Sequence, residues 1–290
     1  MIKCKCIISS IDIGPDTEKI VSYTEYFASK THAAVRLLYV IDYMLTPPSY
    51  LTAYIEEEKK REESEMARWK TLLTDRGVKA EYGIVLGRLH ESFVKVINET
   101  SPDLLVIGYK SHIIRPSSSE RLIRSLNIPM LVVRGESAGN ASIGSVSIKN
   151  ILCPVDFSDS SKKAISYAKE CASLFSADLH LIHVIPSHLI KEKWFIWQKL
   201  EEKDRKKFDE TMLSEAKTNL SLLRSEYGID REGGILQGNP SEMICSFAEG
   251  RKYDLIIMGA RGLSYLQGIL IGSTTEAVLK SSPCPVLIVH

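Results

Sequence analysis

Short apolar runs alternate with longer segments of mixed polarity along the chain. The runs at 151–155, 179–185 and 255–258 are rich in β-branched residues and lack the strict apolar–polar alternation of a half-exposed strand. They therefore predict strands that are covered on both faces, as in a parallel sheet.

The longer segments carry helix signals. Residues 158–175 place apolar side chains at helical spacing, with Ser158 or Asp159 positioned to cap the start. Asn239 followed by Pro240 marks a second helix start, because proline is tolerated in the first turn. Strands that alternate with helices in this way predict an α/β fold with a parallel sheet.

This pattern occurs twice. Apolar runs that end in an aspartate open both halves, and the offset between matched positions grows from 144 to 151 and then 156 along the chain. The matched pairs are Asp12 and Asp156, Val40 and Val184, Gly87 and Gly238, and Gly108 and Gly259. We therefore predict two doubly wound, five-stranded parallel sheets of Rossmann-like type, in which ligands bind outside the carboxyl ends of the strands.

A segment rich in Gly and Ser separates the two copies and is typical of a linker. The domain boundaries that we expect are 1–136 for the first domain, 137–148 for the linker and 149–290 for the second domain. The mixed-charge segments 48–75 and 191–227 are expected to be helices that Trp69, Trp194 and Trp197 pack onto the sheets.

Composition excludes some function classes. Lys and Arg total 37 against 36 Asp and Glu, so the net charge of +1 gives no bulk field for a nucleic-acid partner. The chain shows no signal-peptide pattern and no apolar run long enough for a membrane span, so we expect a cytoplasmic protein without a membrane partner. The six cysteines are scattered and are interpreted as reduced, mostly buried thiols without a metal-site motif.

A glycine-rich segment carries the candidate chemistry. Gly259, Gly262 and Gly272 follow the spacing G-x2-G-x9-G after a predicted strand, and Ser273-Thr274 then opens a predicted helix. Glycines let a ligand approach the backbone closely, and free amides at a helix start favour an anion such as phosphate. The segment therefore predicts a phosphate-binding loop, with a flexible crossover as the alternative.

The strand that ends in Asp156, the His183-Val184 pair, Gly238 and the glycine segment together resemble the universal stress protein family over nearly the whole chain. The glycine spacing is similar to that of its ATP-binding branch. The resemblance implies that Asp156 and Val184 surround an adenine. It also implies that the ribose and phosphates of ATP or AMP lie against Gly259, Gly262, Gly272, Ser273 and Thr274. Arg261 is a further candidate for a phosphate, and Asp156 has the alternative role of capping the helix that follows it.

The first copy departs from this spacing. Ser111 and Pro116 stand where the second copy has its second and third glycines, and the loop is shorter. Proline donates no amide hydrogen, so we predict that this copy does not bind ATP in the family manner. A smaller anion at Ser117-Ser118-Ser119, with Lys110 and Arg115 nearby, is one alternative. An ordinary capped helix on the surface is the other.

Function follows as a hypothesis. We expect a stress-response or signalling module that binds ATP or AMP in its second domain, with Mg²⁺ bridging the phosphates if ATP is hydrolysed. The chain carries no Walker-type lysine and no signature of a catalytic triad, so no catalytic residue is assigned. The alternatives are an enzyme that hydrolyses ATP slowly or transfers adenylyl groups, and a nucleotide-free scaffold. The two copies are expected to form a pseudo-dimer through their last strands, alone or within a homodimer, and the segment around Trp194 is a candidate surface for a protein partner.

Overall fold

The computed structural model describes the chain except for residues 1–3, 43–51, 110–117, 135–140, 187–201 and 263–270. The chain divides into two compact units, Met1–Ser147 and Ile148–His290. Each unit is built around its own sheet, and each is described by itself below.

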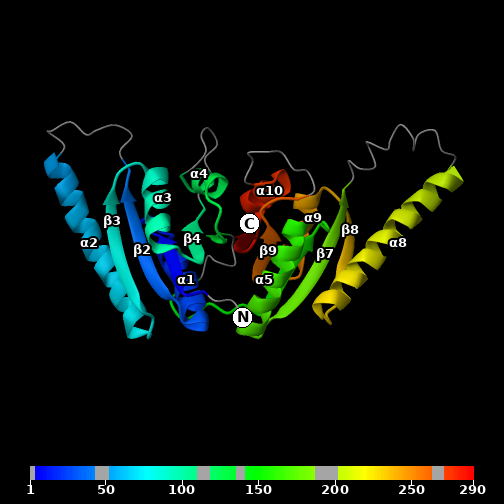
Figure 1. The fold of residues 1–290 in the computed structure, drawn as a ribbon, viewed down its shortest axis with the longest axis horizontal. Coiled ribbons are helices and arrows are strands. Elements are labelled where there is room, and N and C mark those ends of the chain that lie inside the picture. The colour runs from blue at the N-terminus through cyan, green and yellow to red at the C-terminus, as the bar shows by residue number, and fades with distance from the viewer. Residues whose placement is uncertain (1–3, 43–51, 110–117, 135–140, 187–201, 263–270) are drawn as a thin grey trace. The chain divides into compact units, whose positions relative to one another are not determined.

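The first unit alternates strands with helices from end to end (Figure 1). Its elements are β1 (Cys6–Ser10), α1 (Thr17–Thr31), β2 (Ala34–Ile41), α2 (Thr52–Asp75), β3 (Ala80–Leu86), α3 (Leu89–Thr100), β4 (Leu104–Gly108), α4 (Ser118–Ser125) and β5 (Met130–Val133). The strands pair in parallel in the order β3-β2-β1-β4-β5.

The second unit repeats this plan. Its elements are β6 (Asn150–Val155), α5 (Asp159–Phe175), β7 (Asp178–Pro186), α8 (Glu202–Tyr227), β8 (Gly234–Gly238), α9 (Pro240–Gly250), β9 (Leu255–Gly259), α10 (Ser273–Ser281) and β10 (Val286–Val289). The parallel order is β10-β9-β6-β7-β8. The α/β class and the two doubly wound five-stranded sheets expected from the sequence are therefore confirmed.

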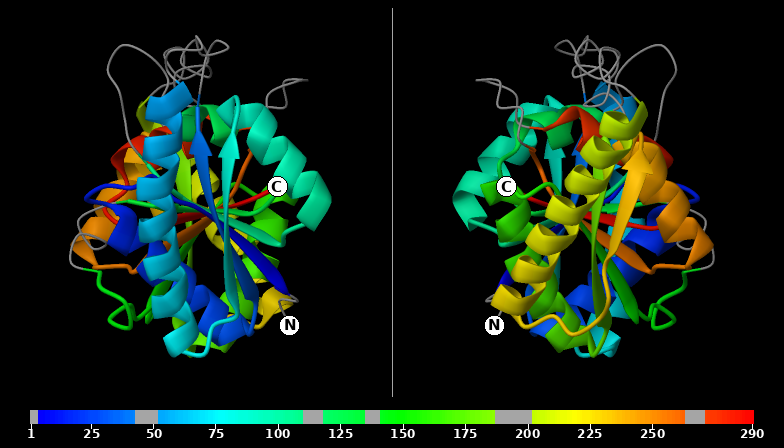
Figure 2. Two further views of the ribbon diagram at one scale, coloured as in Figure 1. Left: turned by 90° about the vertical axis from the view of Figure 1, so that its left-hand side faces the viewer. Right: turned by 90° about the vertical axis from the view of Figure 1, so that its right-hand side faces the viewer.

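Helices cover both faces of each sheet. In the first unit, α2 and α3 lie on opposite sides of the strands, and in the second α8 and α9 do the same (Figure 2). In the second unit α5 packs beside α8, whereas α9 packs beside α10. Every residue of β5, β9 and β10 is buried, which explains why these strands lack polar–apolar alternation.

The helix starts follow the sequence signals. Ser158 caps α5 by accepting a hydrogen bond from the Ser161 amide, and Asn239 caps α9 by accepting one from the Ser241 amide. Trp69 is buried on α2, as expected, whereas Trp194 and Trp197 lie outside the described residues.

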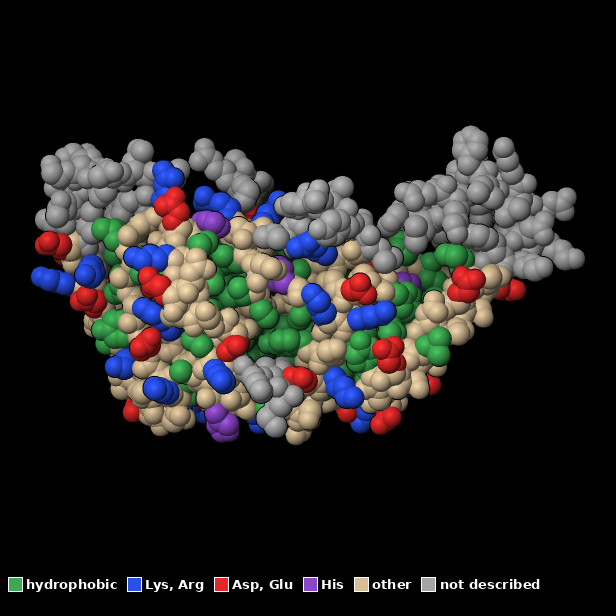
Figure 3. Space-filling model, viewed as in Figure 1, with side chains coloured by type: hydrophobic (Ala, Val, Ile, Leu, Met, Phe, Trp, Pro, Cys, Tyr) green, Lys and Arg blue, Asp and Glu red, His purple; other side chains and the backbone are tan. Residues whose placement is uncertain are grey.

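The six cysteines are free thiols, and all but Cys6 are buried. Burial raises the pKa of Cys4 to about 12, which keeps this thiol protonated and unreactive. Acidic and basic side chains are interspersed over the described face shown in Figure 3, as the net charge of +1 suggests. Within the described residues, no helix has the length and apolar character that a bilayer crossing requires.

Candidate functional site

The two residues expected around a base end neighbouring strands of the second unit. Asp156 directly follows β6, and Val184 lies buried in β7. The β6–β7 register pairs Val155 with His183, so its continuation by one residue sets Asp156 opposite Val184. The fold thus brings these two predicted site residues together at the carboxyl edge of the sheet.

The carboxylate of Asp156 is held by the turn that follows it. Its Oδ1 accepts hydrogen bonds from the Ser158 amide at 3.1 Å and from the Ser158 hydroxyl at 2.5 Å. Ser158 in turn caps α5, so Asp156 acts on the helix start through Ser158 and is not its cap. The alternative prediction that Asp156 caps α5 is therefore wrong, because the cap is Ser158, two residues later.

The glycines differ in what surrounds them. A Cβ atom at Gly262 would collide with Oδ2 of Asp156, so the backbone here lies against the carboxylate. A Cβ atom at Gly259 would lie 2.5 Å from the Ser160 hydroxyl and 3.0 Å from the Ser160 backbone carbonyl group. Gly262 therefore joins the glycine segment to Asp156, whereas Gly259 allows α5 to pack closely against the end of β9.

The start of α10 lacks a side-chain cap. Gly272 occupies the cap position in an extended conformation, and its own amide donates to the Ala260 carbonyl at 2.7 Å. Ser273 and Thr274 form the first helical positions, so their amides have no intrahelical acceptor. The described helices α5 and α9 of the same unit are capped by side chains, whereas α10, like α1 and α3 of the first unit, has no side-chain cap. The first amides of α10 are thus left for an anion. Residues 263–270, the middle of the glycine segment, lie outside the described residues.

Two basic residues, Arg261 and Lys163, lie near this edge of the sheet. The Arg261 amide lies 3.5 Å from the Ser160 hydroxyl, and Lys163 follows one turn later on α5.

His290 lies at the carboxyl end of β10. Its pKa is lowered to about 4, first by burial and then by the positive charges of Arg261 and Lys163. Neither ring nitrogen of His290 has a hydrogen-bond partner in the described structure. The imidazole is therefore neutral at pH 7.

This histidine makes stability depend on pH. In the unfolded chain His290 takes up a proton near its ordinary pKa of 6.5, and in the folded chain it does so only near 4. The stabilisation is thus complete above pH 6.5 and is lost as the pH falls towards 4. We expect acidification over this window to lower the free energy of unfolding by at most about 3 kcal/mol through this group. Urea unfolding at several pH values measures this loss of stability. His290→Asn should make the free energy of unfolding depend less on pH. The control His90→Asn, at an exposed position, should not have this effect.

Two residues of this edge, Phe157 and His183, were not predicted from the sequence as site residues. Phe157 has a φ of +66°, a left-handed conformation that is costly for a bulky residue. Its ring lies 4.5 Å from the His183 ring, centroid to centroid, at an interplanar angle of 38°. Sequence could not reveal Phe157, because nothing in its type signals a left-handed backbone.

The corresponding edge of the first unit is built differently. Tyr109 follows β4 where the second unit has Ala260, and its hydroxyl donates to Glu120 Oε1 at 2.8 Å. Glu120 is buried in the first turn of α4, and the Arg134 guanidinium lies 4.9 Å from the centre of the Tyr109 ring. A buried carboxylate thus stands at this helix start. In the second unit the matched Glu276 pairs instead with Lys280 at 2.8 Å.

Of the alternative anion site in the first copy, Lys110, Arg115 and Ser117 lie outside the described residues, as do Ser111 and Pro116, whereas Ser118 and Ser119 open α4. That alternative stays a prediction.

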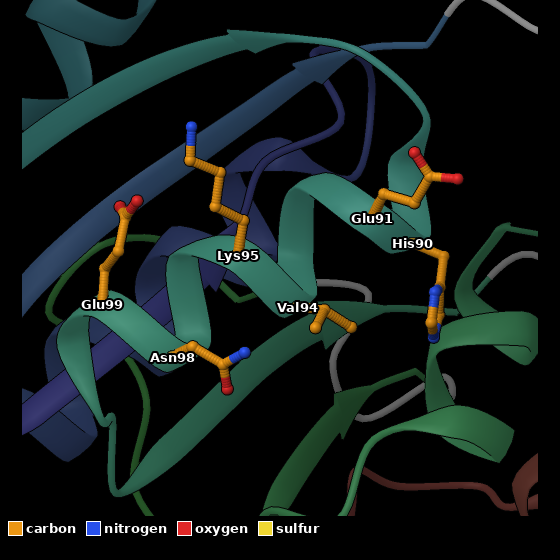
Figure 4. Close-up of a pocket in the computed structure, with 6 residues that line it drawn as sticks. All are labelled: His90, Glu91, Val94, Lys95, Asn98 and Glu99. Atoms are coloured by element: carbon orange, nitrogen blue, oxygen red, sulfur yellow. The ribbon is translucent and has the colours of Figure 1, made fainter.

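Two hollows lie on the first unit. One of about 590 Å³ runs along α3, where Glu91, Lys95 and Glu99 follow one another along one side of the helix and His90, Val94 and Asn98 along another (Figure 4). The other, of about 340 Å³, is lined at its charged positions by Asp42, Arg88, His90, Glu91 and Arg121. Both hollows carry charges of both signs, as solvated helix faces do, and neither selects a class of ligand.

Comparisons with known proteins agree with this architecture. The model of the universal stress protein family matches residues 5–134 and 147–290. The chain belongs to this family. Two universal stress proteins of Methanocaldococcus jannaschii, MJ0531 and MJ0577, are each 33% identical to it, over 146 and 156 residues. These matches span 49% and 50% of the present chain but 81% and 96% of the relatives, as expected when one chain holds two copies of a family domain.

A solved universal stress protein from Archaeoglobus fulgidus matches the fold of the whole chain. Its TM-score is 0.71 at 21% sequence identity, and the match covers 98% of this chain and 96% of that one. The fold is therefore shared along nearly the whole of both chains.

Proposed function

We propose that this universal stress protein binds one adenine nucleotide, ATP or AMP, in its second domain and acts as a nucleotide-dependent module of a stress response or signalling pathway. The observation that carries the proposal is the uncapped start of α10, at the same sheet edge as Asp156 and Gly262. Helix amides without acceptors, two hydroxyl residues and nearby cations are suited to a phosphate chain.

The base would lie at the ends of β6 and β7. Asp156 keeps Oδ2 on the side of Gly262 while Ser158 engages Oδ1, so one carboxylate oxygen is oriented toward the glycine segment. Val184 offers an apolar contact beside it. Gly259, Gly262, Gly272, Ser273 and Thr274 would follow the ribose and phosphates, with Arg261 at the phosphates.

The first domain is proposed to lack this activity. Tyr109 contacts both Glu120 and Arg134 at the edge where the second domain carries its glycine segment. Glu120 is buried in the first turn of α4, whereas the matched Glu276 in the first turn of α10 is paired with Lys280. The buried carboxylate makes the start of α4 less favourable for a phosphate than the start of α10. The expected stoichiometry is therefore one nucleotide per chain.

We favour binding over rapid catalysis because the sequence carries no Walker-type lysine to neutralise a transferring phosphoryl group. Among the described residues, no group of three or more His, Cys, Asp or Glu side chains is placed to hold a metal ion. If ATP is hydrolysed, we propose that Mg²⁺ would enter together with the nucleotide. An enzyme that turns ATP over would do so at rates near 1 s⁻¹ or faster, which is the ordinary range for enzymes.

The experiment that tests the proposal is to denature freshly purified protein and to identify the released nucleotides by chromatography. Release of ATP, AMP or their mixture supports an adenine-binding domain, and nucleotide-stripped protein should rebind it. Protein that releases nothing and rebinds no adenine nucleotide would overturn the proposal in favour of a nucleotide-free scaffold.

A further inference from the structure

Ser158 links the carboxylate of Asp156 to the start of α5. Its hydroxyl donates to Asp156 Oδ1 at 2.5 Å, and the same hydroxyl oxygen accepts from the Ser161 amide at 3.2 Å. Because a serine hydroxyl has one hydrogen and an ionised carboxylate only accepts, the direction of both hydrogen bonds is fixed. The Ser158 amide also donates to Oδ1, at 3.1 Å. A single residue therefore supplies two donors to one carboxylate oxygen.

The first turn of α5 anchors Ser158 in turn. The Ser161 hydroxyl donates to the Ser158 carbonyl oxygen at 2.9 Å, and the Lys162 amide donates to the same oxygen at 3.0 Å. Ser161 itself is buried. The Asp156 side chain is thus tied through Ser158 to a packed helix, and it is tied in the orientation that sets Oδ2 against Gly262.

The first copy lacks this arrangement. Gly14 stands at the position matched to Ser158, so it has no hydroxyl to offer to Asp12. The turn there is held through backbone groups: the Gly14 amide donates to Thr17 Oγ1 at 2.8 Å, and the Thr17 hydroxyl donates to the Asp12 carbonyl oxygen at 2.9 Å. The hydroxyl of Ser158 is therefore a feature of the second copy, which is also the copy with the three spaced glycines.

The geometry points to Ser158 as a positioning residue, whose hydroxyl holds the Asp156 carboxylate against Gly262 in the orientation that receives the nucleotide. This inference rests on the proposed function, and it deepens that function by naming the residue that orders the site before binding. A side chain that is already ordered loses less conformational freedom when a ligand binds. Hydrogen bonds to a charged group belong to the stronger class, so this one can hold the carboxylate in place.

The test measures ATP affinity and stability together, by calorimetric titration and urea unfolding of nucleotide-stripped, full-length protein. Ser158→Gly introduces the residue of the first copy. Glycine costs a helix cap only little relative to serine, so the urea midpoint should change little. ATP affinity should fall about tenfold, as expected when one hydrogen bond to a charged group is lost. Ser158→Thr keeps the hydroxyl, so its ATP affinity should stay within about twofold of the wild type.

Asn239→Ala is the control for the loss of a helix cap in the same unit. It removes the side-chain cap of α9, so it should lower the urea midpoint and leave ATP affinity unchanged. If Ser158→Gly does not fold, Ser158→Ala replaces it, because alanine restricts the backbone more than glycine and also lacks the hydroxyl. The same tenfold loss, approximately, is expected of it.

Three results would overturn the inference and leave the proposed function intact. One is a folded Ser158→Gly or Ser158→Ala protein that binds ATP as tightly as the wild type. Another is a Ser158→Thr protein that binds as weakly as Ser158→Gly, since the hydroxyl would then not matter. The third is an equal loss of ATP affinity in Asn239→Ala. A wild type that binds no ATP would overturn the proposed function and, with it, the inference.

Discussion

Replacing Gly262 with valine is expected to weaken ATP binding about a hundredfold or more, which corresponds to about 3 kcal/mol. The expected loss of affinity arises from a contact at the substituted position itself. Any Cβ atom at this position meets Oδ2 of Asp156, and valine adds two further methyl groups. The substitution therefore displaces the carboxylate proposed to contact the base, and the valine side chain fills the space proposed for the ribose and phosphates.

Calorimetric titration of the stripped variant measures this loss. The matched control is Ser111→Val, which places the same side chain at the corresponding position of the first copy and should leave ATP affinity unchanged. Circular dichroism establishes that both variants are folded. If Ser111→Val abolished binding and Gly262→Val did not, the site would lie in the first domain and the assignment made here would be wrong.

Gly259→Ala is expected to lower the free energy of unfolding by about 1–3 kcal/mol, the usual range for overpacking of a close-packed site. The added methyl would lie 2.5 Å from the Ser160 hydroxyl, which can rotate away. It would also lie 3.0 Å from the Ser160 backbone carbonyl carbon and oxygen, which move only if α5 shifts from β9. The clash is with the backbone, and a change of rotamer does not relieve it.

Urea unfolding of the full chain checks this prediction against Gly250→Ala. A Cβ atom at Gly250 meets nothing within 4 Å, and the residue closes α9, so alanine there should be neutral or slightly stabilising. Equal stability of the two variants would show that β9 and α5 are not packed as closely as described. The pair thus separates the packing role of Gly259 from its proposed contact with a nucleotide.

The repeat made the fold predictable from sequence. Matched aspartates, valines and glycines located corresponding strand ends in both copies, and Ser158 and Asn239 marked helix starts that the structure confirms. These signals are local, because a cap or a buried strand is encoded by adjacent residues.

Features that depend on contacts across strands were not predictable in this way. The hydrogen bond from His183 to the Val155 carbonyl and the packing of Phe157 against the imidazole join residues 26 to 28 positions apart. The same is true in the first unit, where Tyr109 meets Glu120 and Arg134 only after β4, α4 and β5 are assembled. Gly259 also had two sequence interpretations, and only its distance to Ser160 revealed a role in packing α5 onto β9.

The central claim is that one chain holds a single nucleotide site, in the second domain. Calorimetric titration of nucleotide-stripped, full-length protein with ATP tests it most directly, because the stoichiometry is read from the same curve as the affinity. The wild type is expected to bind one equivalent of ATP per chain, and Gly262→Val to weaken the affinity of that single site about a hundredfold or more. Two equivalents per chain would contradict the claim, since the first domain would then bind ATP despite the contacts of Tyr109 with Glu120 and Arg134.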